Sequence, residues 1–182
     1  MTAMNITYIA ILAIVLYLMA GIKLVLQLSR GSQATHNKGL FLSLGFTAVT
    51  LHACFLYQNL LVVNGLNLGI FNALSLLSWI IVCLILVTSF TQPVENLGIA
   101  ALPLAALSLT LELLLPSAHF LSSEAAIGLK LHVLISIISY SLFSIAACQA
   151  MLLAVQNKHL HSKRPGGFIR ALPPLETMET LL

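Results

Sequence analysis

The chain has very little charge. Asp, Glu, Lys and Arg together make up 7% of its 182 residues, and Asp does not occur at all. Because a soluble domain carries about 25% charged residues, this composition excludes an ordinary soluble fold. The net charge of +3 is spread over short links and one tail. It therefore does not indicate a nucleic-acid-binding surface, and we expect no nucleic-acid partner.

Several other chemical signals are missing. The cysteines Cys54, Cys83 and Cys148 lie inside apolar stretches and form no Cys-x-x-Cys pair, which argues against a disulfide framework. The sequence has no glycine-rich phosphate-binding loop. It also has no paired carboxylates and no set of nucleophile, base and orienting residue. We therefore expect a protein that is not an enzyme.

Long apolar stretches dominate what is present. The chain is 59% hydrophobic with a mean hydropathy of +1.03. A membrane-spanning helix needs about 20 mostly apolar residues. Such stretches cover residues 6–26, 40–57, 70–90, 97–115 and 129–155. Because the links between them are short, the sequence predicts an all-α membrane protein, an antiparallel bundle of five transmembrane helices surrounded by lipid.

The basic residues predict how this bundle sits in the membrane. Seven of the eight fall on one side of a five-helix topology, and only Lys130 falls on the other. Since Lys and Arg concentrate on the cytoplasmic side, we expect an outer N-terminus and a cytoplasmic C-terminus. The predicted organisation is a transmembrane bundle over residues 1–157 and a cytoplasmic basic tail over residues 158–182.

The fifth apolar stretch carries an unusual polar stripe. At about 100° per residue, His132, Ser136, Ser139 and Phe143 fall on one side of a helix. A polar stripe inside a membrane is expected to face other helices, a cavity or a ligand. We therefore expect the other four helices to form a wall around this one.

Two histidines are the main candidates for a site. The predicted topology puts His52 and His132 in the outer half of the membrane at similar depth. Two imidazoles on facing helices can bind haem iron from both sides. Alternatively, each histidine is hydrogen-bonded to a serine or a backbone carbonyl in helix packing. The residues alone leave both interpretations open.

Other polar residues extend these candidates. Asn72 and Trp79 share a face of the third helix, where Trp79 can stack on a planar ligand or fill the core. Lys130 can meet an anionic group such as a haem propionate, or it is an ordinary interface lysine. Glu112 allows a third hypothesis, a transporter subunit that moves protons, which the scarcity of intramembrane acids disfavours.

Four segments resemble the cytochrome c assembly family, the CcsA and HemX group of haem-handling membrane proteins. The segment from Asn72 to Trp79 is similar to that family's Asn-x-x-x-Ser-x-x-x-Ser-Trp type segment. The segment from His132 to Tyr140 and the following Ser resembles its His-Val-x-x-x-x-x-x-Ser-Tyr helix. His52 with its neighbours, and the tail with Pro173-Pro174-Leu175, look more like the short HemX-like branch.

The resemblance implies haem as cofactor, with His132 as an outward-facing axial ligand. It also implies a bacterial inner-membrane location. Together with the similar depth of the two histidines, it gives the hypothesis that His52 is a possible second ligand and that Trp79, Asn72, Tyr140 and Lys130 lie around the haem. Partners would be other proteins of cytochrome c maturation or haem synthesis. An alternative is a HemX-like membrane regulator or scaffold of tetrapyrrole synthesis without a stable haem site. The family's Trp-rich motif does not occur, and we expect the chain to be truncated before it.

Overall fold

The computed structural model describes residues 3–29, 38–62, 65–92, 94–117, 119–122 and 125–161. Within these ranges the main elements are five long helices: α1 (Ala3–Ser29), α2 (Lys38–Leu60), α3 (Ile70–Thr88), α4 (Gly98–Leu114) and α5 (Ile127–His161). All five contain a stretch long and apolar enough to cross a membrane. The predicted set of five spans is therefore confirmed, and each predicted span overlaps one observed helix.

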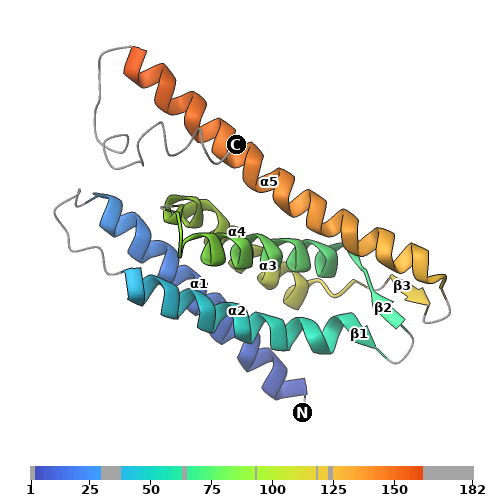
Figure 1. The fold of residues 1–182 in the computed structure, drawn as a ribbon. Helices are drawn as coiled ribbons and strands as arrows, with labels where there is room; N and C mark the ends of the chain where they lie inside the picture. Colours follow the sequence, from blue (N-terminus) through green and yellow to red (C-terminus); the bar gives the residue numbers. More distant parts are fainter. Residues whose placement is uncertain are drawn as a thin grey trace.

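Successive helices run in alternating directions, so the bundle has two distinct ends (Figure 1). α1 begins, α2 ends, α3 begins, α4 ends and α5 begins at the end where the short strands lie, which we call the sheet end. The opposite end holds the turn between α3 and α4, and we call it the turn end. α5 continues six residues beyond the predicted boundary at residue 155 and ends at His161. The rest of the predicted tail, residues 162–182, lies outside the described residues.

Helices α1 to α4 enclose the core. α1 packs against α2 and α4, while α3 packs against α2 and α4. Tyr17, Phe41, Leu86 and Leu102 are its largest fully buried side chains. Gly45 lies where α2 packs closely on α3: a Cβ at this position would lie 2.6 Å from a terminal methyl of Leu86, which would have to shift to make room.

Two of the links form a small β-sheet, which the sequence analysis did not predict. The strands β1 (Leu61–Val62), β2 (Gly65–Asn67) and β3 (Phe120–Ser122) pair antiparallel in the order β1-β2-β3. Leu61 pairs with Leu66, and Leu66 pairs in turn with Leu121. Gly65 has a φ of 128°, a left-handed conformation that favours glycine where β2 begins.

Asn67 fastens this sheet to the helices. Its side-chain oxygen accepts hydrogen bonds from the backbone N–H of Gly69 (3.2 Å) and of His119 (3.0 Å). Its side-chain nitrogen donates to the carbonyl of Ser117 at 3.2 Å. One side chain thereby joins the start of α3 to the segment after α4, and the sheet end becomes a single connected unit.

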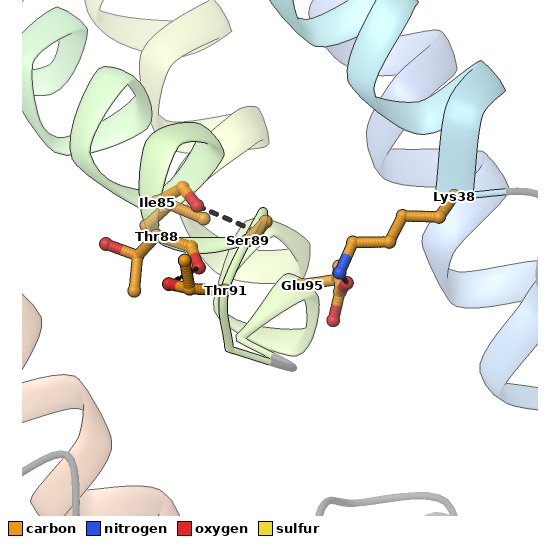
Figure 2. Close-up of polar contacts among 6 residues, drawn as sticks. All are labelled: Lys38, Ile85, Thr88, Ser89, Thr91 and Glu95. Carbon is orange, nitrogen blue, oxygen red and sulfur yellow. Dashed lines mark hydrogen bonds and ion pairs between the residues drawn. The ribbon is translucent and has the colours of Figure 1, made fainter.

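An ion pair joins two elements at the turn end. Lys38 begins α2, and its Nζ lies 2.8 Å from Oε1 of Glu95 in the short 3₁₀ helix η1 (Glu95–Leu97), as Figure 2 shows. Glu95 is buried, whereas Lys38 is partly exposed. In the preceding turn, buried Ser89 donates from its hydroxyl to the carbonyl of Ile85 at 2.8 Å (Figure 2). The ion pair therefore fixes the start of α2 to the α3–α4 connection.

α5 lies apart from this core. It runs along one side of the bundle (Figure 1), and its main helix contact is with α3. Only 6% of its most apolar 18-residue stretch is buried, against 33–50% in the other four helices. An open apolar groove of about 250 Å³ remains between α5 and the pair α3 and α4. The expectation that the other helices surround the fifth is therefore wrong.

Candidate functional site

A hydrogen-bonded chain of side chains crosses the interior of the bundle. His52 of α2 is fully buried. Its Nδ1 lies 3.1 Å from the hydroxyl of Tyr17 on α1, and its Nε2 lies 2.9 Å from the hydroxyl of Ser75 on α3. The Tyr17 ring also meets the imidazole edge-on, with centroids 5.8 Å apart. Both ring nitrogens of His52 therefore already have partners in this arrangement.

The other candidates on α3 also make contacts between elements. Trp79 is half-buried, and its Nε1–H donates to the carbonyl of Val49 on α2 at 3.0 Å. Asn72 is buried near the start of α3, and its side-chain nitrogen donates to the carbonyl of Asn67 at 3.3 Å. These bonds satisfy polar groups that would be costly to bury alone. They also hold α3 against α2 and the sheet.

A polar cavity opens at the sheet end, and sequence reasoning did not find it. Its volume is about 270 Å³. The polar residues of its wall come from α1, α2, β2, α3, α4 and the segment after α4: Thr7, Asn59, Asn67, Asn72, Glu112 and Ser117. Glu112, which is 4% exposed, is the one acid in this wall. The signal for it in the sequence is a lone glutamate within an apolar span. The sequence analysis connects this glutamate only with the hypothesis of proton transport.

The remaining candidates lie on α5. His132 is exposed, Tyr140 is 64% exposed, and Lys130 is half-buried. The serines of this helix bond to their own backbone: Ser139 donates to the carbonyl of Ile135 at 2.8 Å, and Ser144 donates to that of Tyr140 at 2.7 Å. These two serines, of which Ser139 belongs to the polar stripe, are therefore satisfied within α5 and do not require a second helix against them.

The structure thus divides the predicted site residues into two groups. His52, Asn72 and Trp79 lie within the contacts of α2, α3 and the sheet, whereas His132, Lys130 and Tyr140 lie on α5. α2 and α5 share no extensive contact, so the two histidines are not brought together. Within the described ranges, moreover, no group of three or more His, Cys, Asp or Glu side chains is placed to hold a metal ion.

Five helices long and apolar enough to span a membrane, four of which enclose a hydrophobic core with buried polar groups, define a multi-pass membrane protein. The model of a family described as cytochrome C assembly protein matches residues 39–182, so the chain belongs to this family. The family predicted from the motifs of α3 and α5 is thereby confirmed. Comparison with curated proteins and with solved structures gives no match.

Proposed function

We propose that this chain binds haem on α5 and presents it for cytochrome c assembly at the outer side of a bacterial inner membrane. Membership of the cytochrome c assembly family supports haem as the cofactor. The observation that carries the proposal is the position of His132, an exposed imidazole on a helix face that the bundle leaves uncovered. An exposed imidazole can approach haem iron without any rearrangement of the bundle.

The surroundings of His132 fit one face of a haem. Leu129 and Ile135, one turn before and one turn after, are both exposed and apolar. A Cβ added to Gly128 would meet nothing within 4 Å, so the surface is open on this side. Lys130 lies two residues earlier in α5, which places it on another side of the helix from His132. A contact between Lys130 and a propionate therefore stays a prediction. Haem bound to His132 would supply a redox-active iron, and the apolar side chains of Leu129 and Ile135 would lie beside it.

α5 offers one histidine ligand at this place rather than two. α5 has no second histidine between Ile127 and Ala154. His52 could bind iron only after giving up a hydrogen bond to Tyr17 or Ser75. We therefore infer that the second axial ligand comes from a partner of the maturation system. This is consistent with a chain that presents haem instead of enclosing it.

The orientation is part of the same proposal. Lys23 and Lys38 lie toward the turn end, and Lys130 lies at the sheet end. Because basic residues favour the cytoplasmic side, we place the turn end in the cytoplasm and the sheet end outside. His132, near the start of α5, is then close to the outer surface, where apocytochromes receive haem.

An absorption spectrum of the detergent-purified protein tests the proposal. We expect haem bands in the wild type that disappear in His132→Ala and persist in His119→Ala, a control that removes another exposed histidine of the sheet end. His52→Gln tests the second imidazole: loss of low-spin bands in this variant as well would make His52 the partner ligand.

Two results would contradict the proposal. Bands that survive unchanged in His132→Ala would move the site away from α5. A folded wild-type protein that takes up no haem would favour the alternative, a membrane regulator or scaffold of tetrapyrrole synthesis. Circular dichroism of each variant separates loss of haem from loss of fold.

A further inference from the structure

The small sheet at the sheet end has an open edge. β3 is the last strand in the order β1-β2-β3, so only one of its two sides is paired. Among the described elements, only β2 packs extensively against β3. The side chain of Phe120 in this strand is 51% exposed. An edge strand with unpaired backbone groups is a template to which another strand can add.

The register shows which backbone groups face this edge. Asn67 of β2 lies opposite Phe120 of β3, and the backbone N–H of the following residue, Leu68, donates to the carbonyl of His119 at 2.7 Å. Hydrogen-bonded and non-hydrogen-bonded pairs alternate along an antiparallel ladder. Since Leu68 and His119 form a bonded pair, the N–H and C=O of Phe120 point away from β2. The same alternation directs the N–H and C=O of Ser122 to the open edge.

These backbone groups define the chemistry of a ligand. Among the described residues, the backbone of Phe120 has no hydrogen-bond partner outside the sheet. A donor and an acceptor at every second residue are matched by another extended backbone, as in β-strand addition. A strand that pairs with Phe120 and Ser122 would form about four main-chain hydrogen bonds. Its side chain next to Leu121 would share a face with Leu66, so an apolar residue is favoured there.

We propose that the open edge of β3 binds an extended segment of the apocytochrome that accepts haem, by strand addition. The inference rests on the proposed function, which places haem on α5 at the same end of the bundle. Ser122 ends β3, and Ile127 begins α5 after a short link. At 1.5 Å per residue, His132 lies about 8 Å along the helix from Ile127. A segment paired with β3 is therefore held near the haem.

Strand addition also positions the groups that react with haem. The attachment sequence of c-type cytochromes, Cys-x-x-Cys-His, contains a histidine. An extended residue spans about 3.4 Å, so a few residues beyond the paired stretch bring this histidine to the iron as the second axial ligand. Because β3 has three residues, the contact is small, and the segment can leave after haem attachment.

Amide hydrogen exchange of the full chain in detergent tests the proposal. The chain has eight Phe, so selective isotope labelling of phenylalanine gives few amide signals, and Phe120→Ala identifies that of Phe120. We expect the Phe120 N–H to exchange rapidly in the free protein. An excess of a reduced synthetic peptide that contains Cys-x-x-Cys-His should slow this exchange at least about tenfold, because the N–H then donates to the peptide.

Two substitutions at one position separate the backbone from the side chain. Phe120→Pro removes the N–H at the edge, and proline is tolerated where the N–H of an edge strand faces away from its neighbour. We expect the affinity for the labelled peptide, measured by fluorescence anisotropy, to fall about tenfold. Phe120→Ala is the matched control, since it shortens the same side chain but keeps the N–H, and it should bind within about threefold of the wild type. Circular dichroism confirms that both variants are folded.

Three results would overturn the proposal. The first is a Phe120 N–H that is already protected in the free protein or that the peptide leaves unchanged. The second is equal peptide affinity of Phe120→Pro and the wild type. The third is protection that increases with protein concentration in the absence of peptide, because the edge would then pair with a second copy of the chain.

The haem spectra separate this proposal from the proposed function. Haem bands that depend on His132, in a protein whose Phe120 N–H does not respond to the peptide, would remove the strand addition and leave the proposed function standing. Protection of Phe120 by the peptide in a folded chain that takes up no haem would remove the proposed function and leave a peptide-binding edge.

Discussion

The four-helix core and α5 have similar apolar compositions, but the hydrogen bonds of their polar side chains go to different partners. In the core, polar groups bond between helices: Tyr17 to His52, His52 to Ser75, and Ser78 to Ser108 at 2.6 Å. On α5, Ser139 and Ser144 bond to the carbonyl four residues before them. The core therefore uses some of its polar groups to fix neighbouring helices, whereas these two serines of α5 are satisfied within their own helix.

This difference teaches that a polar residue in a membrane helix does not by itself identify a helix contact. A serine hydroxyl can return to its own backbone at no cost in unsatisfied groups. An imidazole has nitrogens on two sides of its ring, and the backbone of its own turn can meet one of them but not both. Histidine is thus the informative residue of each region, buried and bonded in α2 but exposed on α5.

Replacing the two histidines should give the largest contrast in stability. His52→Ala leaves the hydroxyls of Tyr17 and Ser75 without their partner and opens a cavity, so we expect the free energy of unfolding in detergent to fall by about 2–4 kcal/mol. His132→Ala removes an exposed side chain and should change it by less than about 0.5 kcal/mol. Thermal or denaturant unfolding followed by circular dichroism measures both, and equal losses would break the comparison.

Two glycines show the same difference in packing between the core and α5. A Cβ at Gly69 would lie 2.5 Å from the carbonyl oxygen of Ser117, whereas one at Gly128 of α5 would meet nothing within 4 Å. Gly69→Ala should therefore destabilise the protein by about 1–3 kcal/mol through overpacking. Gly128→Ala should be neutral or slightly stabilising, since Ala is the better helix former. A tolerated Gly69→Ala would show that the sheet end is not held tightly.

The spans were predictable because the requirement for them is local. A stretch of about 20 apolar residues is visible in the sequence without knowledge of its neighbours. The hairpin of β1 and β2 also had a local signal, which the sequence analysis missed: Asn64-Gly65 between apolar residues is typical of a tight turn. The pairing of β2 with β3 had none, because it joins links more than 50 residues apart.

The rotation of each helix was not predictable in the same way. All the helices are apolar on most sides, so periodicity does not show which face of α1 carries Tyr17 toward His52. The interpretation of His52 as a packing histidine was one of two open alternatives, and the hydrogen bonds to Tyr17 and Ser75 favour it. The peripheral position of α5 followed from neither composition nor motif.

The ion pair at the turn end should contribute less than the buried histidine. Lys38 is partly exposed and can reach water when its partner is neutralised, so Glu95→Gln should cost about 1 kcal/mol or less. Added salt should reduce the stability of the wild type by a similar amount, with little effect on Glu95→Gln. Salt effects of equal size in both proteins would mean that the pair does not fasten α2 to η1.

The smallest expected effect is the coupling between two serines of the core. It directly tests whether hydrogen bonds between helices distinguish the core from α5. Ser78 and Ser108 meet between α3 and α4, so Ser78→Ala and Ser108→Ala should be coupled in a double-mutant cycle by about 0.6 kcal/mol, the average for hydrogen bonds between membrane helices. Ser139→Ala on α5 removes only a bond to its own helix and should show no coupling to either. Because each hydroxyl of the pair also bonds to its own backbone, a coupling near zero would mean that these local bonds suffice. The bonds between elements of the core would then depend on His52, Trp79 and Asn72 and not on this pair of serines.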